Sequence, residues 1–203
     1  RFLDGAASLA FREYLKTQDP PRATWDALGE VTSDPGAVDR HVGAILELPQ
    51  LDVKRLQRRK LKVALDCVRG AGGVIMPRLL EDLGCEVVAI HTEPDGHFPR
   101  DPEPTADSLA ELGELVRESG AEIGLAVDPD VDRLSLVDEQ GRPLGEDLTL
   151  ALAAAVVLRE TPGPLVTNLS TSRVVEDVAE AYESPLVRAP VGAATVARRA
   201  KEG

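Results

Sequence analysis

The sequence predicts an α/β protein in which mixed, mainly parallel sheets are flanked by helices, in two similar domains of which the second is truncated. From residue 60 onward, short apolar runs typical of buried strands alternate with segments of helical periodicity, and this alternation indicates parallel βαβ units. The order strand, small-residue loop, amphipathic helix and strand occurs at residues 62–90 and again at residues 164–190, which indicates a weak internal repeat at the scale of a domain.

The first part of the chain has a different character. A short helix is expected at residues 9–16, and the Pro and Gly residues between 18 and 36 predict a loop. A second helix is expected at 39–48, capped near Asp34 and ended by Pro49.

The α/β part can be divided into elements because Gly and Pro separate its apolar runs. Strands are expected within residues 60–68, 85–92, 121–127, 133–144, 164–169 and 184–191. Helices are expected within residues 70–84, 106–120, 145–160, 170–183 and 192–202, and residues 52–60 are expected to form a helical turn or a linker. We therefore expect three regions: residues 1–59 as the tail of a preceding domain plus a linker, 60–145 as one α/β domain, and 146–203 as the start of the next.

Composition limits the classes of partner. Acidic residues outnumber basic ones 35 to 23, giving a formal net charge of −12, which speaks against nucleic acid or an anionic membrane as a partner. No apolar run approaches the roughly 20 residues of a membrane span, and no signal peptide is visible. Cys67 and Cys85 make no disulfide framework, so we expect a cytoplasmic protein. From the net charge and the lack of an apolar span, we expect no nucleic-acid or membrane partner.

An acidic loop follows one of the predicted strands. Asp128, Asp130 and Asp132 alternate along "DPDVDR", and Arg133 comes directly after them. In a parallel α/β sheet, ligands bind beyond the carboxyl ends of the strands, which is where this loop is expected. In an extended loop Asp130 would point away from the other two carboxylates, unless the loop curls around a cation. Three carboxylates are hard oxygen donors of the kind that Mg²⁺ or Ca²⁺ prefers.

Two other metal-binding patterns share part of this spacing. An EF-hand would have Asp at positions one, three and five and Glu139 at position twelve, but Arg133 occupies the position that needs Gly, and the flanking runs predict strands. A haloacid-dehalogenase-like phosphatase also has an Asp-x-Asp after an apolar strand. That signature normally opens its domain, whereas two βαβ units precede it here, and a third Asp followed by Arg is not its usual continuation.

The "DPDVDR" loop closely resembles the metal loop of the alpha-D-phosphohexomutases, the family that includes phosphoglucomutases, phosphomannomutases and phosphoglucosamine mutases. "RHVGAILELPQLDVKRLQRRKLKVALDCVRGAGG" resembles the start of that family's second domain, and "PDGHFPRDPEPT" resembles its Phe-Pro, Pro-x-Pro loop. "VTNLSTSRVVEDVAE" and "VRAPVGAATVARR" are similar to the start of its third domain. The resemblance covers residues 38–203.

The resemblance implies a phosphoryl shuttle acting on a phosphosugar. A phosphoserine would pass its phosphoryl group to a hexose phosphate, the resulting bisphosphate would reorient, and its other phosphate would return to the serine. Asp128, Asp130 and Asp132 would bind Mg²⁺, and Arg133 would bind phosphate.

Several motifs of that family are absent from these 203 residues. They are the serine loop (T-A-S-H-N-P or close), the sugar loop G-E-x-S-G and the phosphate-binding R-x-S-G-T. The chain therefore reads as a fragment with no catalytic residue of its own, and we expect it to be inactive alone, because covalent catalysis needs its nucleophile. The alternatives are a haloacid-dehalogenase-like phosphatase or a non-catalytic module that binds metal or phosphosugar. The hexose and the oligomeric state are not predicted.

Overall fold

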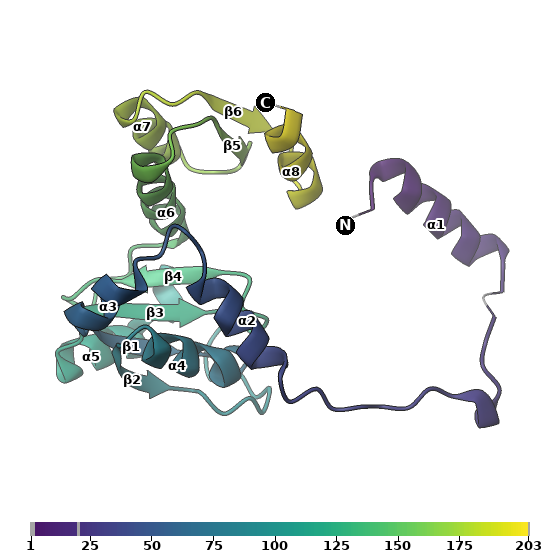
Figure 1. Cartoon of the computed structure of the whole chain (residues 1–203), viewed down its shortest axis with the longest axis horizontal. Helices are drawn as coiled ribbons and strands as arrows, with labels where there is room; N and C mark the ends of the chain where they lie inside the picture. The colour runs from purple at the N-terminus through teal and green to yellow at the C-terminus, as the bar shows by residue number, and fades with distance from the viewer. Residues whose placement is uncertain (1–2, 20, 203) are drawn as a thin grey trace. The chain divides into compact units, whose positions relative to one another are not determined.

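The computed structural model describes residues 3–19 and 21–202, which form two compact units. The larger unit consists of residues 36–163 and 171–185, and the smaller one of the described residues up to 35, of 164–170 and of those from 186 onward. Figure 1 labels the α-helices and strands of both units.

A four-stranded sheet forms the centre of the larger unit (Figure 1). Its strands are β1 (Lys62–Asp66), β2 (Glu86–Ile90), β3 (Ile123–Val127) and β4 (Leu134–Val137), in the order β2-β1-β3-β4. β1 pairs in parallel with β2 and β3, whereas β4 pairs antiparallel to β3. This mixed, mostly parallel sheet confirms the predicted fold class, and its three parallel strands all end on one side.

Helices flank this sheet because alternate residues of the strands are apolar on both faces. The helices of the larger unit are α2 (Ala37–Leu46), α3 (Val53–Arg59), α4 (Gly72–Asp82), the short 3-10 helix η2 (Ala106–Ser108), α5 (Ala110–Ser119), α6 (Glu146–Glu160) and α7 (Val174–Ala181). Ala64 and Ala126 face a core cluster with Leu112 and Val116 of α5. The neighbouring positions, among them Val63 and Val127, face a second cluster that includes Leu80 of α4. The sheet is therefore packed on both sides.

Two helix ends show how far local sequence signals decide where a helix begins or ends. Gly120 ends α5 in the left-handed region with φ of 67°, as a glycine stop signal predicts. The cap was expected near Asp34, and the N-cap residue observed is Gly36, two residues later, because α2 begins at Ala37.

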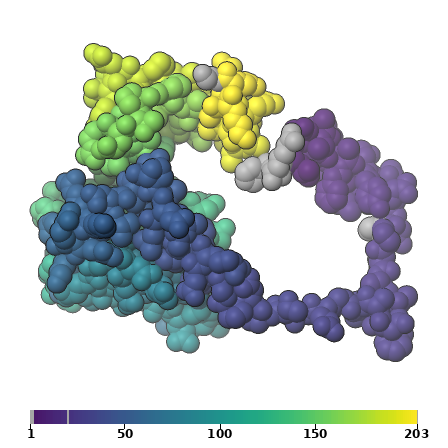
Figure 2. Space-filling model, viewed as in Figure 1, coloured from purple at the N-terminus to yellow at the C-terminus, as the bar shows by residue number. Residues whose placement is uncertain are grey.

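The smaller unit contains α1 (Gly5–Thr17), the 3-10 helix η1 (Trp25–Ala27), β5 (Leu165–Asn168), β6 (Leu186–Ala189) and α8 (Ala193–Glu202). β5 and β6 pair in parallel, and α8 contacts β5. Residues 21–35 are exposed throughout, and Figure 2 shows them as a thin stretch of chain. Within the described part of the chain, no helix is both long and apolar enough to cross a membrane.

Candidate metal centre

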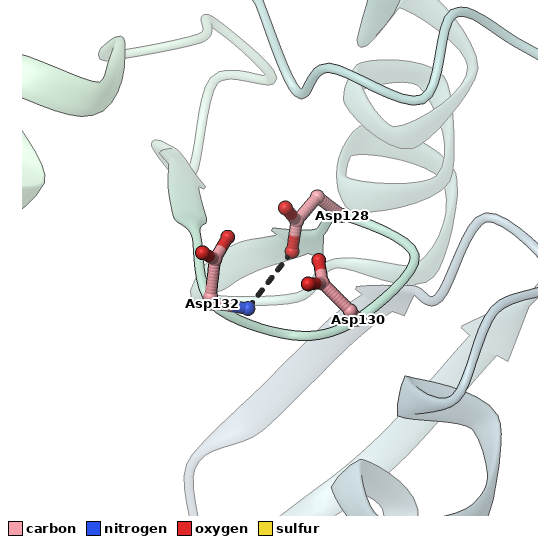
Figure 3. Close-up of side chains that lie close together, drawn as sticks. All are labelled: Asp128, Asp130 and Asp132. Atoms are coloured by element: carbon pink, nitrogen blue, oxygen red, sulfur yellow. Dashed lines mark hydrogen bonds between the residues drawn. The ribbon is translucent and has the colours of Figure 1, made fainter. Parts of the chain in front are cut away.

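The acidic loop, residues 128–133, connects β3 to β4 and is called the metal loop from here on. One carboxylate oxygen from each of Asp128, Asp130 and Asp132 lies within 4.8 Å of the others. Figure 3 shows the three side chains directed toward a common space inside the loop. The loop thus brings together the three residues that its sequence spacing singled out.

Backbone hydrogen bonds explain why the loop curls. The Val131 N–H donates to the Asp128 carbonyl at 3.2 Å, which closes a tight turn over Pro129. The carboxylate Oδ1 of Asp128 accepts the N–H groups of Asp132 at 3.0 Å and of Arg133 at 3.2 Å; the first of these bonds is the dashed line in Figure 3. The buried Asp128 therefore fixes the backbone of the loop through Oδ1, and its Oδ2 takes no part in these two bonds.

Val131 adopts an unfavourable backbone conformation within this curl. Its φ is 65°, in the left-handed region that β-branched residues rarely occupy. Such a conformation costs about 1–3 kcal/mol and persists only where the surrounding structure enforces it. The shape of the loop is therefore imposed by its surroundings rather than preferred by its sequence.

The three carboxylates repel one another in the absence of a cation. The pKa of Asp132 is raised, first by its hydrogen bond to the side chain of Asp128 and then by the negative charge of Asp130. Asp130 and Asp132 are exposed and Asp128 is buried. A cluster of hard oxygen donors that share excess negative charge fits a divalent cation such as Mg²⁺.

Arg133, the predicted phosphate ligand, lies beside the carboxylates. Its Nε is 3.8 Å from Asp128 Oδ2 and 3.6 Å from Asp132 Oδ1. Its Nη1 forms an ion pair with Glu103 of residues 94–105, called the Pro-rich loop from here on. The guanidinium is thus held at the metal loop by a residue that no local sequence pattern pointed to.

A glycine-rich stretch supports the metal loop from outside. The Ala71 N–H donates to the Pro129 carbonyl at 2.8 Å. A Cβ on Gly70 would lie 2.6 Å from the Pro129 Cα, and a Cβ on Gly72 would lie 2.7 Å from a methyl group of Val127. A stretch such as "RGAGG", between a strand and a helix, can form either a phosphate cradle or a tight strand-to-helix turn. The structure supports the turn, because the N–H groups of Gly70, Ala71 and Gly73 all donate to backbone carbonyls.

The sequence did not predict a buried polar network that lies next to the metal loop, at the carboxyl ends of the parallel strands. Asp66, the last residue of β1, is 1% exposed and bonds to Arg100 and His91. The available signal was a carboxylate at the end of a buried strand, but the spacing of 25 and 34 residues to its partners forms no local motif.

Fold and site together define an α/β protein with a carboxylate loop at the carboxyl ends of a mostly parallel sheet. Comparison with known families is more specific. The model for the alpha/beta/alpha domain II of phosphoglucomutase/phosphomannomutase matches residues 39–141, and the model for domain III matches residues 145–203. The chain belongs to this family, the alpha-D-phosphohexomutases.

Individual relatives agree with the family match. A phosphoglucomutase/phosphomannomutase of Thermococcus kodakarensis is 39% identical over 188 residues, which are 92% of this chain and 41% of the relative. A protein of Methanopyrus kandleri named a probable phosphoglucosamine mutase is 35% identical over 94% of this chain and 41% of its own length. The crystal structure of a family protein from Burkholderia thailandensis superposes with a TM-score of 0.65 at 29% identity, covering 81% of this chain and 35% of that one. The chain thus spans about two fifths of the curated relatives that it matches.

Proposed function

We propose that this chain is the metal-loop portion of a phosphohexomutase. The whole protein would interconvert the 1-phosphate and the 6-phosphate of a hexose through a phosphoserine and a sugar bisphosphate. The observation that carries the proposal is the convergence of Asp128, Asp130 and Asp132 within 4.8 Å, in a domain that matches domain II of the family.

The three carboxylates would hold Mg²⁺. Bound there, Mg²⁺ would stabilise the negative charge that develops on a phosphoryl group during transfer. Asp128 would contribute its Oδ2, because Oδ1 already accepts two backbone N–H groups and so fixes the plane of the carboxylate. Asp130 and Asp132 are exposed and would complete the set from the open side.

Arg133 would bind a phosphate oxygen. Its guanidinium presents several N–H donors in a planar fork, which matches the geometry of phosphate. The ion pair with Glu103 keeps this fork next to the carboxylates, so that a phosphate would be met by a group already in place. Since the pair is about half exposed, a phosphate can compete for the guanidinium.

The chain alone should not catalyse the reaction. Covalent phosphoryl transfer needs a nucleophile, and the serine motif that the family resemblance implies is absent from these 203 residues. The choice of sugar stays open, since the names of the relatives refer to glucose, mannose and glucosamine phosphates.

A chimera tests the proposal. This chain would replace the matching segment of the Thermococcus kodakarensis relative, and conversion of glucose 1-phosphate to glucose 6-phosphate would be measured with Mg²⁺ present. We expect the chimera to be active and Asp130→Asn to lower kcat by roughly 100-fold, because loss of a ligand removes several kcal/mol of charge stabilisation. Asp107→Asn, at an exposed aspartate of η2, is the matched control and should keep full activity.

Three results would contradict the proposal. A folded chimera in which Asp130→Asn is as active as the control would remove the metal role from the loop. A folded chimera without activity would favour a non-catalytic module that binds metal or phosphosugar. Conversion by the 203-residue chain alone would show that the reaction does not use the family's serine.

A further inference from the structure

Arg100 reaches the metal loop from the Pro-rich loop that follows β2. Its side chain is 10% exposed. Its Nε donates to Asp66 Oδ2 at 2.6 Å, and its Nη2 donates to the Val127 carbonyl at 3.1 Å. Val127 is the last residue of β3, so this carbonyl belongs to the peptide that leads directly into Asp128.

Asp66 connects this arginine to the ends of two further strands. Asp66 Oδ1 accepts the Val68 N–H at 2.8 Å and lies 3.0 Å from Nδ1 of His91, the residue that follows β2. Arg100 also donates through Nη1 to its neighbour's carbonyl, that of Asp101, at 2.8 Å. One buried network therefore joins the carboxyl ends of β1, β2 and β3.

We propose that Arg100 is a positioning residue for the metal loop, holding the peptide before Asp128 in the orientation that lets Asp128 converge with Asp130 and Asp132. The proposal rests on the proposed metal-binding function of the loop. It adds a residue that touches neither the carboxylates nor the space among them, and acts through the backbone.

The loop needs such external support for two reasons. Its three carboxylates carry like charges and lie within 4.8 Å of one another, so they repel, and Val131 is held in a conformation that its side chain disfavours. Two peptides near Asp128 are fixed from outside: the Val127–Asp128 peptide by Arg100 at the Val127 carbonyl, and the Pro129–Asp130 peptide by the Ala71 N–H at the Pro129 carbonyl. Groups of this kind, one step behind the ligands, typically change metal affinity about 10–100-fold when they are replaced.

A purely structural role is the competing explanation, since Arg100 also neutralises the buried Asp66. Arg100→Lys separates the two. Lysine keeps a positive charge for Asp66, but a single ammonium group cannot reproduce the fork that reaches both Asp66 and the Val127 carbonyl. Arg117→Lys is the matched control, because Arg117 Nη1 donates to the Gly141 carbonyl at 3.4 Å, in the turn after β4 at the opposite end of the sheet.

The test is a titration of the 203-residue chain with Mn²⁺, a hard divalent ion whose free form is counted by electron paramagnetic resonance. Thermal unfolding followed by circular dichroism gives the temperature at which each variant unfolds, and the titration is done well below that temperature, where the variant is folded. We expect Arg100→Lys to raise the Mn²⁺ dissociation constant about 10-fold relative to the unmodified chain, and Arg117→Lys to leave it unchanged. Arg100→Gln, measured in the same way, should weaken binding at least as much.

Each other outcome has a definite meaning. Mn²⁺ affinity of folded Arg100→Lys equal to that of the control would overturn the positioning role while leaving the proposed function intact. Failure of both Arg100 variants to fold would assign the residue to stability and overturn it too. Absence of Mn²⁺ binding to the unmodified chain at millimolar concentration would instead remove the metal assignment on which the proposed function depends.

Discussion

Cys67 directly follows β1, and Cys85 directly precedes β2, the parallel neighbour of β1. Both are free thiols. Burial raises the pKa of Cys67 to about 12, and the negative charge of Asp66 beside it adds to the effect. Burial also raises the pKa of Cys85, which is only partly enclosed. Since the thiolate is the reactive form, neither thiol is activated, and access decides which one reacts first.

We predict that iodoacetamide at pH 8 labels Cys85 before Cys67 in the folded chain. Cys67 is fully buried, so it should react only when the sheet opens, and mass spectrometry of peptides would show the order. In concentrated urea the two should react at similar rates, which is the control. Labelling of Cys67 as fast as Cys85 in the folded state would contradict the predicted order.

The raised pKa of Cys67 also affects the stability of the fold. The contribution of the protonated thiol to stability is complete below pH 9 and is lost as the pH rises toward 12.

The predictability of the site differs from residue to residue. The three aspartates could be found from sequence because their spacing, between two apolar runs, is itself the signal. The positive φ of Val131 could not be found, because nothing in a valine indicates the left-handed region. Glu103 and Arg100 were also missed, since their partners Arg133 and Asp66 lie about 30 residues away in sequence and only the closed sheet brings them together.

At the scale of elements, the glycine-rich stretch before α4 and the metal loop after β3 depend on one another. Gly70 lies so close to Pro129 that a Cβ would be 2.6 Å from both its Cα and its carbonyl oxygen. These are backbone atoms, which cannot swing aside as the end of a side chain could. The approach of the two loops therefore requires glycine at this position.

We predict that Gly70→Ala destabilises the chain by about 1–3 kcal/mol, as overpacking usually does, because one of the two loops must move. Gly43→Ala is the matched control. Gly43 lies within α2, and a methyl group there would meet no atom within 4 Å beyond the backbone of its own helix and its chain neighbours. Alanine at this position should therefore stabilise the chain by about 0.5–1 kcal/mol. Urea unfolding measures both changes. If the two substitutions shift the midpoint in the same direction, the close contact with Pro129 does not exist in solution.

Strands were more predictable than helix ends. The apolar runs that become β1, β2 and β3 are short, rich in Val, Ile and Leu, and bounded by turn residues, and parallel pairing follows from the helices between them. The N-cap residue of α2 was expected near Asp34 because Asp is a good capping residue by type, whereas Gly36 is the N-cap residue in the structure. Capping preferences are small energies, so the packing of a helix can override them.

For the whole molecule, the sequence predicted two successive α/β parts, and the matches to domains II and III agree with that order. The boundaries expected at residues 60 and 146 stay predictions. They were placed at changes in composition, and a change in composition does not report which helix packs on which sheet.

The stretch that joins α1 to α2 should be the most accessible part of the chain to a protease. Residues 21–35 are all exposed, and apart from the three residues of η1 they form no helix or strand. Exposed segments with few backbone hydrogen bonds are the preferred sites of proteolytic cleavage. Arg22 is the only lysine or arginine in this segment, so trypsin has one target there.

We therefore predict that brief treatment with trypsin cleaves first after Arg22 and leaves a product that begins at Ala23. This product should bind Mn²⁺ with the affinity of the intact chain, because the residues that form the metal loop and its supports belong to the larger unit. Mass spectrometry identifies the product, and the Mn²⁺ titration is repeated on it after purification. Arg22→Gln is the control and should delay cleavage without changing metal affinity. First cleavage within residues 60–145, or a product that binds Mn²⁺ 10-fold more weakly than the intact chain, would show that the larger unit does not hold the metal loop by itself.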